Sequence, residues 1–349
     1  MKRIISCMIV FTALFSACNK KEDCTICYAD PAVLEITLCL EQEPTTKATA
    51  YLSSQTYEKQ VNNVQILVFD SSGALNIYKD VGTSTSGISI NTTTGSKTIW
   101  AVINGPSLTS IKTLSALRNT AVDLGNNSTT ASEGFVMSGS SEITVGSAST
   151  SVSIQVERLL SRVALQKITN SLPASYGTMT INNVCLANVV GNQNLAGAAT
   201  ISTWYNKMGR KDGATTSSQI IDGATYLASH PTLTFKSVES SVASGASHTP
   251  TTPYLFYTFP NSTGNDVTGW ATSFTARKTR LVVAATIGGK KYYYPVVIDT
   301  PSRNNAYTVE LTITGLGSTD PDTPVVKGSV NASITVLGWT SGTVYEEII

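Results

Sequence analysis

The stretch Val330–Trp339, VNASITVLGW, lies near the end of the chain and alternates regularly between apolar and polar residues. A period of two places the apolar side chains on one face of a β-strand. They are Val330, Ala332, Ile334 and Val336. The preceding segment, Gly315–Lys327, is rich in Gly, Pro, Asp and Thr, a composition typical of a linker. A strand isolated in this way can complete its own sheet or be added to the sheet of a neighbour.

The composition indicates an extracellular all-β protein. The chain has 349 residues, which is enough for two ordinary domains. Charged residues make up 13%, about half of the usual quarter, and 24 Lys+Arg against 23 Asp+Glu give a net charge of +1. No basic patch or arginine-rich helix points to nucleic acid.

The N-terminus has the pattern of an export signal. Lys2 and Arg3 precede the apolar run Ile4–Phe15, which is too short to span a bilayer as a helix. The run ends in Leu-Phe-Ser-Ala-Cys18, which resembles a bacterial lipobox in which the cysteine becomes the lipidated first residue. We therefore predict a signal peptide over 1–17 and an acyl (palmitate) anchor on Cys18 that holds the protein on a membrane. The alternative is an ordinary secretory signal with an incidental cysteine.

The other cysteines give no strong signal for a metal or redox site. Cys24 and Cys27 form a CxxC pair, but no second pair is present, and both histidines, His230 and His248, are far along the chain. We favour a cysteine pair with no metal-binding or redox role, in a tether between Cys18 and the first strand. The sequence leaves open whether the two cysteines form a disulfide. Cys185, in a strand-like run, is expected to be a small buried apolar residue.

The first strand after the tether is predicted at Ala32–Leu40, AVLEITLCL. Its apolar alternation places four side chains on one face: Leu34, Ile36, Leu38 and Leu40. Between Lys21 and Lys59 the only basic residue is Lys47, in a polar loop followed by Ala48. A trypsin-like protease would find a single site there, since exposed loops are where nicking occurs. The alternative is a simple surface lysine.

Further short strands are separated by turn signals. The best candidates are Val61–Phe69 with a return at Ala74–Lys79, Lys97–Asn104, the hairpin Arg280–Ile298 around Gly288-Gly289, and Tyr307–Thr314. Ser107–Arg118 has apolar residues at a three-residue spacing and is predicted to be a helix. The sequence thus predicts two tandem antiparallel β-sandwich domains, 48–158 and 159–349, with one or two short helices.

The domain boundary is expected near Leu159, within the run Glu157–Ile168. One interpretation of Arg158 and Arg162 is that their guanidinium groups donate hydrogen bonds to carboxylates or carbonyls at a domain junction. The other is that they are solvated charges at a strand edge. The basic cluster Lys207, Arg210 and Lys211 is interpreted as a solvated loop, with an anion-binding patch as the alternative.

Patterns of known catalysts are missing from the sequence. It contains no GxSxG, no GxGxxG after a strand, no P-loop and no HExxH. Asp320-Pro321-Asp322 lacks the spaced oxygen ligands of a calcium loop. We therefore expect a protein that is not an enzyme and that needs no cofactor or metal.

Several stretches together resemble the fimbrillin family, the FimA-like subunits of lipoprotein-derived type V pili of Gram-negative bacteria. Besides the lipobox, they are VQILVFDSSG at Val64–Gly73, WAVINGP at Trp100–Pro106, FVMSG at Phe135–Gly139, RLLSRV at Arg158–Val163, YYYPVV at Tyr292–Val297, NAYTVELTITGLG at Asn305–Gly317 and ITVLGW at Ile334–Trp339. Each motif is short, and their order along nearly the whole chain carries the resemblance.

The resemblance implies transthyretin-like sandwiches and assembly by donor-strand exchange. Segment 18–47 would be the tether and the removable strand, cut behind Lys47, and 318–349 would be the donor segment of a neighbouring identical or related subunit. Arginine-specific cleavage is typical of the family, so the lysine implies either a different protease or an uncut subunit at a filament end. The competing hypothesis is a non-polymerising tip, anchor or adhesin that binds a glycan or host protein, with Trp204 and Tyr205 as candidate contacts.

Overall fold

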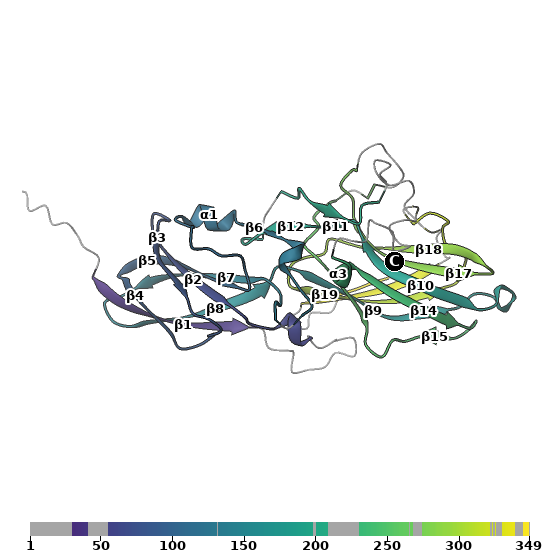
Figure 1. The fold of residues 1–349 in the computed structure, drawn as a ribbon, viewed down its shortest axis with the longest axis horizontal. Helices are drawn as coiled ribbons and strands as arrows, with labels where there is room; N and C mark the ends of the chain where they lie inside the picture. The colour runs from purple at the N-terminus through teal and green to yellow at the C-terminus, as the bar shows by residue number, and fades with distance from the viewer. Residues whose placement is uncertain are drawn as a thin grey trace, which may run out of the picture.

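The computed structural model describes residues 30–40, 55–130, 132–197, 200–208, 230–264, 266–267, 274–321, 323, 325, 330–338 and 345–348. The signal segment, Cys18, Cys24, Cys27, Lys47, Ala48, Arg210 and Lys211 lie outside these residues. Among the described residues, strands dominate and two β-domains follow one another along the long axis of the molecule (Figure 1). The all-β prediction is confirmed.

The first domain contains one hydrogen-bonded series of strands in the order β3-β2-β5-β7-β8-β1-β4. The strands are β1 (Pro31–Leu40), β2 (Val64–Asp70), β3 (Leu75–Asp80), β4 (Ile88–Thr93), β5 (Gly95–Ile103), β7 (Met137–Val145) and β8 (Thr150–Arg158). Side chains of β2 and β5, such as Ile66 and Ile99, pack against Leu34 of β1 and Ile154 of β8. The series therefore folds over into two layers around one apolar core.

The predicted helix Ser107–Arg118 is wrong over its first half. The structure has α1 only at Leu114–Arg118, where Thr113 caps it by accepting a hydrogen bond from Ala116 N at 3.1 Å. Just before the cap the backbone is held extended, because Leu75 N donates to Lys112 O at 2.8 Å and Thr113 bridges to Ala74. The apolar residues at three-residue spacing thus belong partly to a loop, at Leu108 and Ile111, and partly to the short helix, at Leu114 and Leu117.

The second domain has two large sheets, besides the short two-stranded sheet of β11 (Val189–Val190) and β13 (Trp204–Tyr205). One has the order β14-β10-β17-β18, and the other has β15-β9-β19-β20-β21 with β16 also paired to β9. Their strands are β9 (Ser161–Asn170), β10 (Met179–Ala187), β14 (Phe235–Val242), β15 (Ser247–His248), β16 (Tyr254–Thr258), β17 (Thr279–Ile287), β18 (Lys290–Ile298), β19 (Asn305–Ile313), β20 (Val330–Gly338) and β21 (Tyr345–Ile348). The helical segments of this domain among the described residues are α3 (Pro231–Thr234) and the 3₁₀ turn Ala174–Tyr176.

The hairpin β17–β18 confirms the prediction from the Gly-Gly pair. Gly288 and Gly289 both have positive φ, 55° and 77°, as a two-residue hairpin turn requires. Pro295 lies in β18, the last strand of its sheet, in keeping with the expectation that proline would mark an edge or a bulge.

The prediction of purely antiparallel sheets is wrong for two strand pairs. β1 runs parallel to β8, and β19 runs parallel to β9. In both cases the partners are separated by most of a domain in sequence. A period of two specifies which face of a strand is buried, but it carries no information on the direction of a distant neighbour.

The chain passes from the first domain to the second at Leu159-Leu160, between β8 and β9. A two-stranded sheet connects the domains, in which β6 (Ala121–Asp123) pairs with β12 (Asn192–Asn194). One apolar cluster contains residues of both, among them Trp100 and Phe135 on one side and Phe256 on the other. The two sandwiches therefore share a packed junction.

Candidate functional site

The first strand of the chain, β1, is an interior strand of the first domain. It pairs antiparallel with β4 over Pro31–Ile36 and parallel with β8 over Leu34–Leu40. Leu34 and Ile36 are almost fully buried, and Ala32 and Leu38 nearly so, while Leu40 at the end is half-buried. The predicted inward face is therefore present, with the buried set starting at Ala32.

The surroundings of β1 define a groove, which we name the β1 groove: its two sides are β4 and β8, and its floor is the apolar face of β2 and β5. The floor side chains include Ile66, Val68 and Ile99, all fully buried. If β1 were absent, the facing backbone edges of β4 and β8 and this floor would be uncovered.

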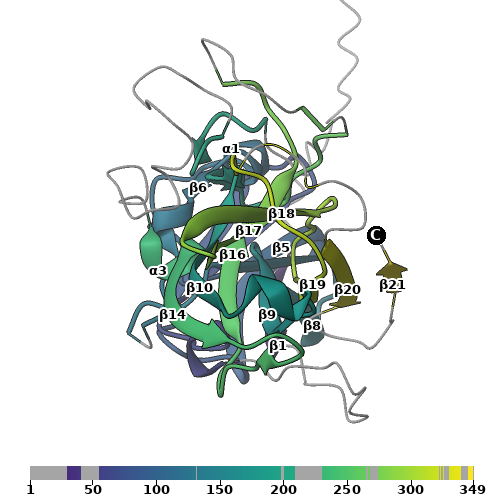
Figure 2. The ribbon, with the colours of Figure 1, turned by 90° about the vertical axis from the view of Figure 1, so that its right-hand side faces the viewer.

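The last long strand, β20, completes its own sheet in this structure. It pairs antiparallel with β19 from Val330 to Gly338, and β21 pairs with β20 on the other side. Figure 2 shows β19, β20 and β21 side by side at one flank of the second domain. Ala332 and Ile334 are buried and belong to the main core cluster, while Val330 and Val336 are half-buried and pack against it.

The linker between β19 and β20 is docked over its described first part. Tyr293 and Ser318 exchange two backbone hydrogen bonds, with N–O distances of 2.8 and 3.0 Å, and Tyr294 Oη donates to Gly315 O at 3.1 Å. A Cβ at Gly317 would lie 2.5 Å from Tyr293 O, so glycine permits this close approach. The linker thus crosses to β18 of the opposite sheet before the chain returns to β20.

A buried polar network joins the domains next to the β1 groove. Glu58, at the end of the 3₁₀ turn Thr56–Glu58, accepts hydrogen bonds at its carboxylate from Arg162 Nη1 at 2.9 Å and Tyr257 Oη at 2.6 Å. Its carbonyl accepts from Arg158 Nε at 2.7 Å. The pKa of Tyr257 is raised well above its usual value by burial and by the Glu58 charge. The interpretation of Arg158 and Arg162 as junction donors is the correct one.

The aromatic pair predicted as a ligand contact is not arranged as one. Trp204 is 9% exposed and packs against Phe274, with ring centroids 5.3 Å apart. Tyr205 donates to Asp123 Oδ2 at 2.9 Å, and its pKa is raised to about 12, first by burial and then by this carboxylate. Tyr205 therefore stabilises the contact between the domains, whereas Trp204 packs against an aromatic ring of its own domain. The Lys207 ammonium lies 5.5 Å from the Phe274 ring centroid.

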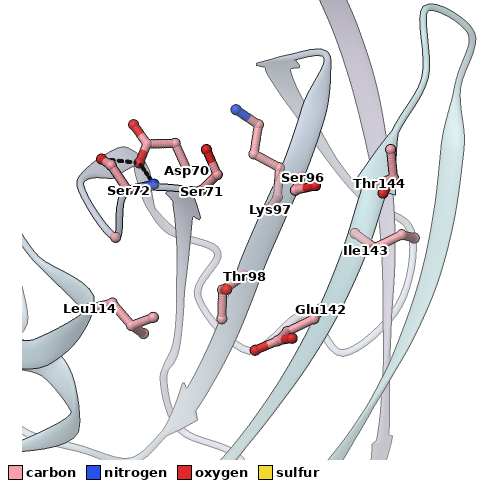
Figure 3. Close-up of a pocket in the computed structure, with 11 residues that line it drawn as sticks. Asp70, Ser71, Ser72, Ser96, Lys97, Thr98, Leu114, Glu142, Ile143 and Thr144 are labelled. Carbon is pink, nitrogen blue, oxygen red and sulfur yellow. Dashed lines mark hydrogen bonds between the residues drawn. The ribbon is translucent and has the colours of Figure 1, made fainter.

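A polar hollow of about 630 Å³ lies on the first domain, between the β2–β3 turn, β5, β7 and α1 (Figure 3). Asp70 is used within the turn, where it accepts from Ser72 Oγ at 2.6 Å and from Ser72 N at 2.8 Å, and the Ser72 hydroxyl lowers its pKa. Lys97 Nζ donates to Thr93 Oγ1 at 2.9 Å. These side chains therefore support the turn and the sheet.

The described residues contain neither a cluster of metal ligands nor a membrane-spanning helix. No three His, Cys, Asp or Glu side chains lie close enough to hold a metal ion in that part of the chain. No helix there is long and apolar enough to cross a bilayer. Cys185 is fully buried, as expected, and burial raises the pKa of its thiol.

Two elements of the site could not be identified from local sequence patterns. One is Glu58, whose burial depends on arginines about a hundred positions away. The other is β4, whose ISINTT pattern is that of an ordinary short strand, although it forms one side of the β1 groove.

Comparison with known proteins confirms the resemblance to fimbrillins. Residues 32–153 match the family described as major fimbrial subunit protein (FimA). No curated protein matches the chain.

Solved structures share the fold over nearly the full length. A candidate cell adhesion protein from Bacteroides eggerthii has a TM-score of 0.61 at 23% identity, covering 89% of this chain and 97% of that one. A fimbrilin (FimA) from Porphyromonas gingivalis has a TM-score of 0.60 at 13% identity, covering 90% and 99%. The C-terminally truncated tip fimbrial protein Mfa3 of the same species has a TM-score of 0.52 at 12% identity, covering 89% and 100%.

Proposed function

From the premise that this chain is a pilus-related protein with the fold of fimbrial subunits, we propose that it is a structural subunit of a surface fimbrium, polymerised by donor-strand exchange and supporting adhesion. It would be exported as a lipoprotein, anchored through Cys18 to the outer membrane, and activated by removal of β1. Its partners would be identical or related subunits, with no nucleic acid and no catalytic step.

The position of β1 is the observation that carries the proposal. β1 is hydrogen-bonded to a strand on each side and has an apolar face in the core. Its covalent connection to the later strands runs only through residues 41–54. One cut in that segment would convert it into a separate, replaceable piece. Three fully buried Leu or Ile side chains contribute roughly 5–9 kcal/mol on transfer scales, as an upper bound, so an empty groove would bind a replacement strand.

The proposed occupant is β20 of a second copy. β20 has nine residues against ten in β1, and both present four apolar side chains to a core at two-residue spacing. To be donated, β20 must leave β19 of its own subunit. Moving a strand from its own sheet to the sheet of a neighbour costs little free energy, because similar contacts are broken and re-formed. Head-to-tail donation then produces a fibre and not a closed dimer.

Cleavage after Lys47 would separate β1 from a well-anchored remainder. The described chain leaves the groove at Leu40 and resumes at Gln55, three residues before the buried Glu58. The new N-terminus at Ala48 would thus begin just ahead of a segment held by Arg158 and Arg162. These contacts support removal of β1 without disturbing the domain junction.

The alternative is a subunit that is not cut and occupies the tip or the anchor position. The observation that favours it is that β20 is already paired on both sides, with β19 and β21. In that case the adhesive surface would have to lie away from Trp204, because the Trp204 side chain is buried.

The experiment is limited digestion of the purified chain with a lysine-specific protease. We expect an N-terminus at Ala48 by sequencing and a ladder of SDS-resistant oligomers, and the variant Lys47→Gln should give neither. Clipped protein that remains monomeric at high concentration would reject polymerisation and support the uncut alternative.

A further inference from the structure

Strand β4 depends on β1 for its place in the sheet. Within the part of the chain that the structure describes, the six residues of β4 pair with β1 and with no other strand. On its free side, β4 is the terminal strand of the seven-stranded series. Removal of β1 would therefore leave β4 without a backbone partner.

Two side-chain contacts hold β4 to β3, the strand at the other end of the series. Thr92 Oγ1 donates to Asn76 Oδ1 at 2.6 Å, and Lys79 Nζ donates to the backbone oxygen of Ser89 at 2.8 Å. Thr92 is buried, whereas Lys79 is exposed. We name these two contacts the β3–β4 tether. They do not involve β1, so they persist when β1 is removed.

The direction of β4 allows it to pair directly with the opposite side of the groove. β4 is antiparallel to β1 and β1 is parallel to β8, so β4 is antiparallel to β8. Ser89 and Ser151 are both paired with Glu35, and both are exposed on the same face. Loss of β1 would leave these strands about 9–10 Å apart, two strand spacings, with unpaired N–H and C=O groups facing each other.

We propose that β4 is a movable side of the β1 groove. When the groove is empty, β4 closes onto β8 and completes the sheet, with Ser89 opposite Ser151. The β3–β4 tether slows this closure, so that the groove stays open longer for an incoming strand. Asn76, Lys79 and Thr92 are thus positioning residues for strand uptake. This inference rests on the proposed function, because it requires that β1 is removed.

A disulfide trap tests the closure. The pair Ser89→Cys and Ser151→Cys is too far apart to join while β1 lies between them, since bonded cysteines have Cα atoms about 4.4–6.8 Å apart. After removal of 1–47, the remaining natural cysteine is Cys185, which is buried. We expect mild oxidation to cross-link the clipped chain and not the intact chain.

Two controls separate closure from general loosening. The pair Ser89→Cys and Gln155→Cys is out of register by four residues and should not cross-link in the clipped chain. Thr92→Val, which removes one tether bond, should speed cross-linking of the in-register pair by about fivefold, the effect of one hydrogen bond. Asn91→Ala, on the exposed face of the same strand, should leave the rate unchanged.

A synthetic peptide of residues 330–348 separates this inference from the proposed function. If the peptide binds the clipped chain and suppresses the cross-link, both are supported. If the cross-link forms and the peptide neither binds nor suppresses it, β4 closes and the donor-strand proposal fails. The inference that β4 is a movable side of the groove is overturned if the peptide binds but the in-register pair never cross-links faster than the out-of-register pair. It is also overturned if Thr92→Val has no effect on the rate of cross-linking.

Discussion

Arg162 Nη1 lies 2.9 Å from Glu58 Oε2, and both side chains are almost completely buried where the two domains meet. Glu58 follows residues 41–54, the segment that contains Lys47, and Arg162 is the second residue of β9 in the other domain. A buried charge is tolerated only when it is paired and hydrogen-bonded. The contact therefore ties the segment before β2 to the second domain.

Replacing Glu58 should destabilise the whole molecule. In Glu58→Gln the Arg162 guanidinium stays buried beside a neutral group, and breaking a buried pair typically costs about 3–5 kcal/mol. We expect a lower urea midpoint, measured by circular dichroism. The matched control is Asp299→Asn, which breaks the more exposed ion pair with Lys278 and should cost less than about 1 kcal/mol. Equal losses in the two variants would contradict a structural role for the buried pair.

Shortening an inward side chain of β1 should affect the precursor and not the processed chain. Ile36→Ala removes buried methylene groups and should lower the unfolding free energy of the intact chain by about 2–5 kcal/mol. After clipping and loss of β1, the variant and the wild type have the same sequence and should unfold alike. Thr37→Ala, on the exposed face, is the control and should change little. If Ile36→Ala left the intact chain unaffected, β1 would not be part of its core.

The sequence was informative wherever a local pattern decides the structure. Period-two runs predicted β1, β19 and β20 to within one or two residues at each end, and Gly288-Gly289 predicted the β17–β18 turn. In each case the burial of one face and the turn geometry are set by residues adjacent in the chain.

The remaining features depend on distant partners and could not be predicted. The parallel pairing of β1 with β8 joins residues more than a hundred positions apart, and the contact of Arg158 with the Glu58 carbonyl joins residues 100 positions apart. The period of Leu108 and Ile111 fits a helix, but the neighbouring Lys112 bonds to Leu75, so tertiary contacts overrode the local preference. Trp204 was a candidate ligand contact under the competing hypothesis, yet it packs beside Phe274.

A change in the inward face of β20 should affect both the monomer and the polymer. Ile334→Ala removes a buried side chain from the second domain's own sheet, so we expect the free energy of unfolding to fall by about 2–5 kcal/mol. The same side chain would enter the neighbour's groove, so SDS-resistant ladders of the clipped variant should be lost or shortened. Ser333→Ala, on the exposed face, is the control. Normal ladders from Ile334→Ala would argue against β20 as the donor.

Acidification should loosen the corner formed by β14, β15 and β16. His248 Nδ1 lies 2.9 Å from Ser240 Oγ and Nε2 lies 2.8 Å from Tyr254 Oη, and burial lowers its pKa from the usual 6.5. A lowered pKa means that the unfolded chain binds the proton more readily, so the stabilisation is complete above pH 6.5 and declines as the pH falls through the lowered pKa. We expect the urea midpoint to drop between pH 7.5 and 5, and His248→Gln to abolish that part of the drop. His230→Gln, which removes the other histidine, should retain it, and an equal drop in wild type and His248→Gln would rule out His248 as the cause.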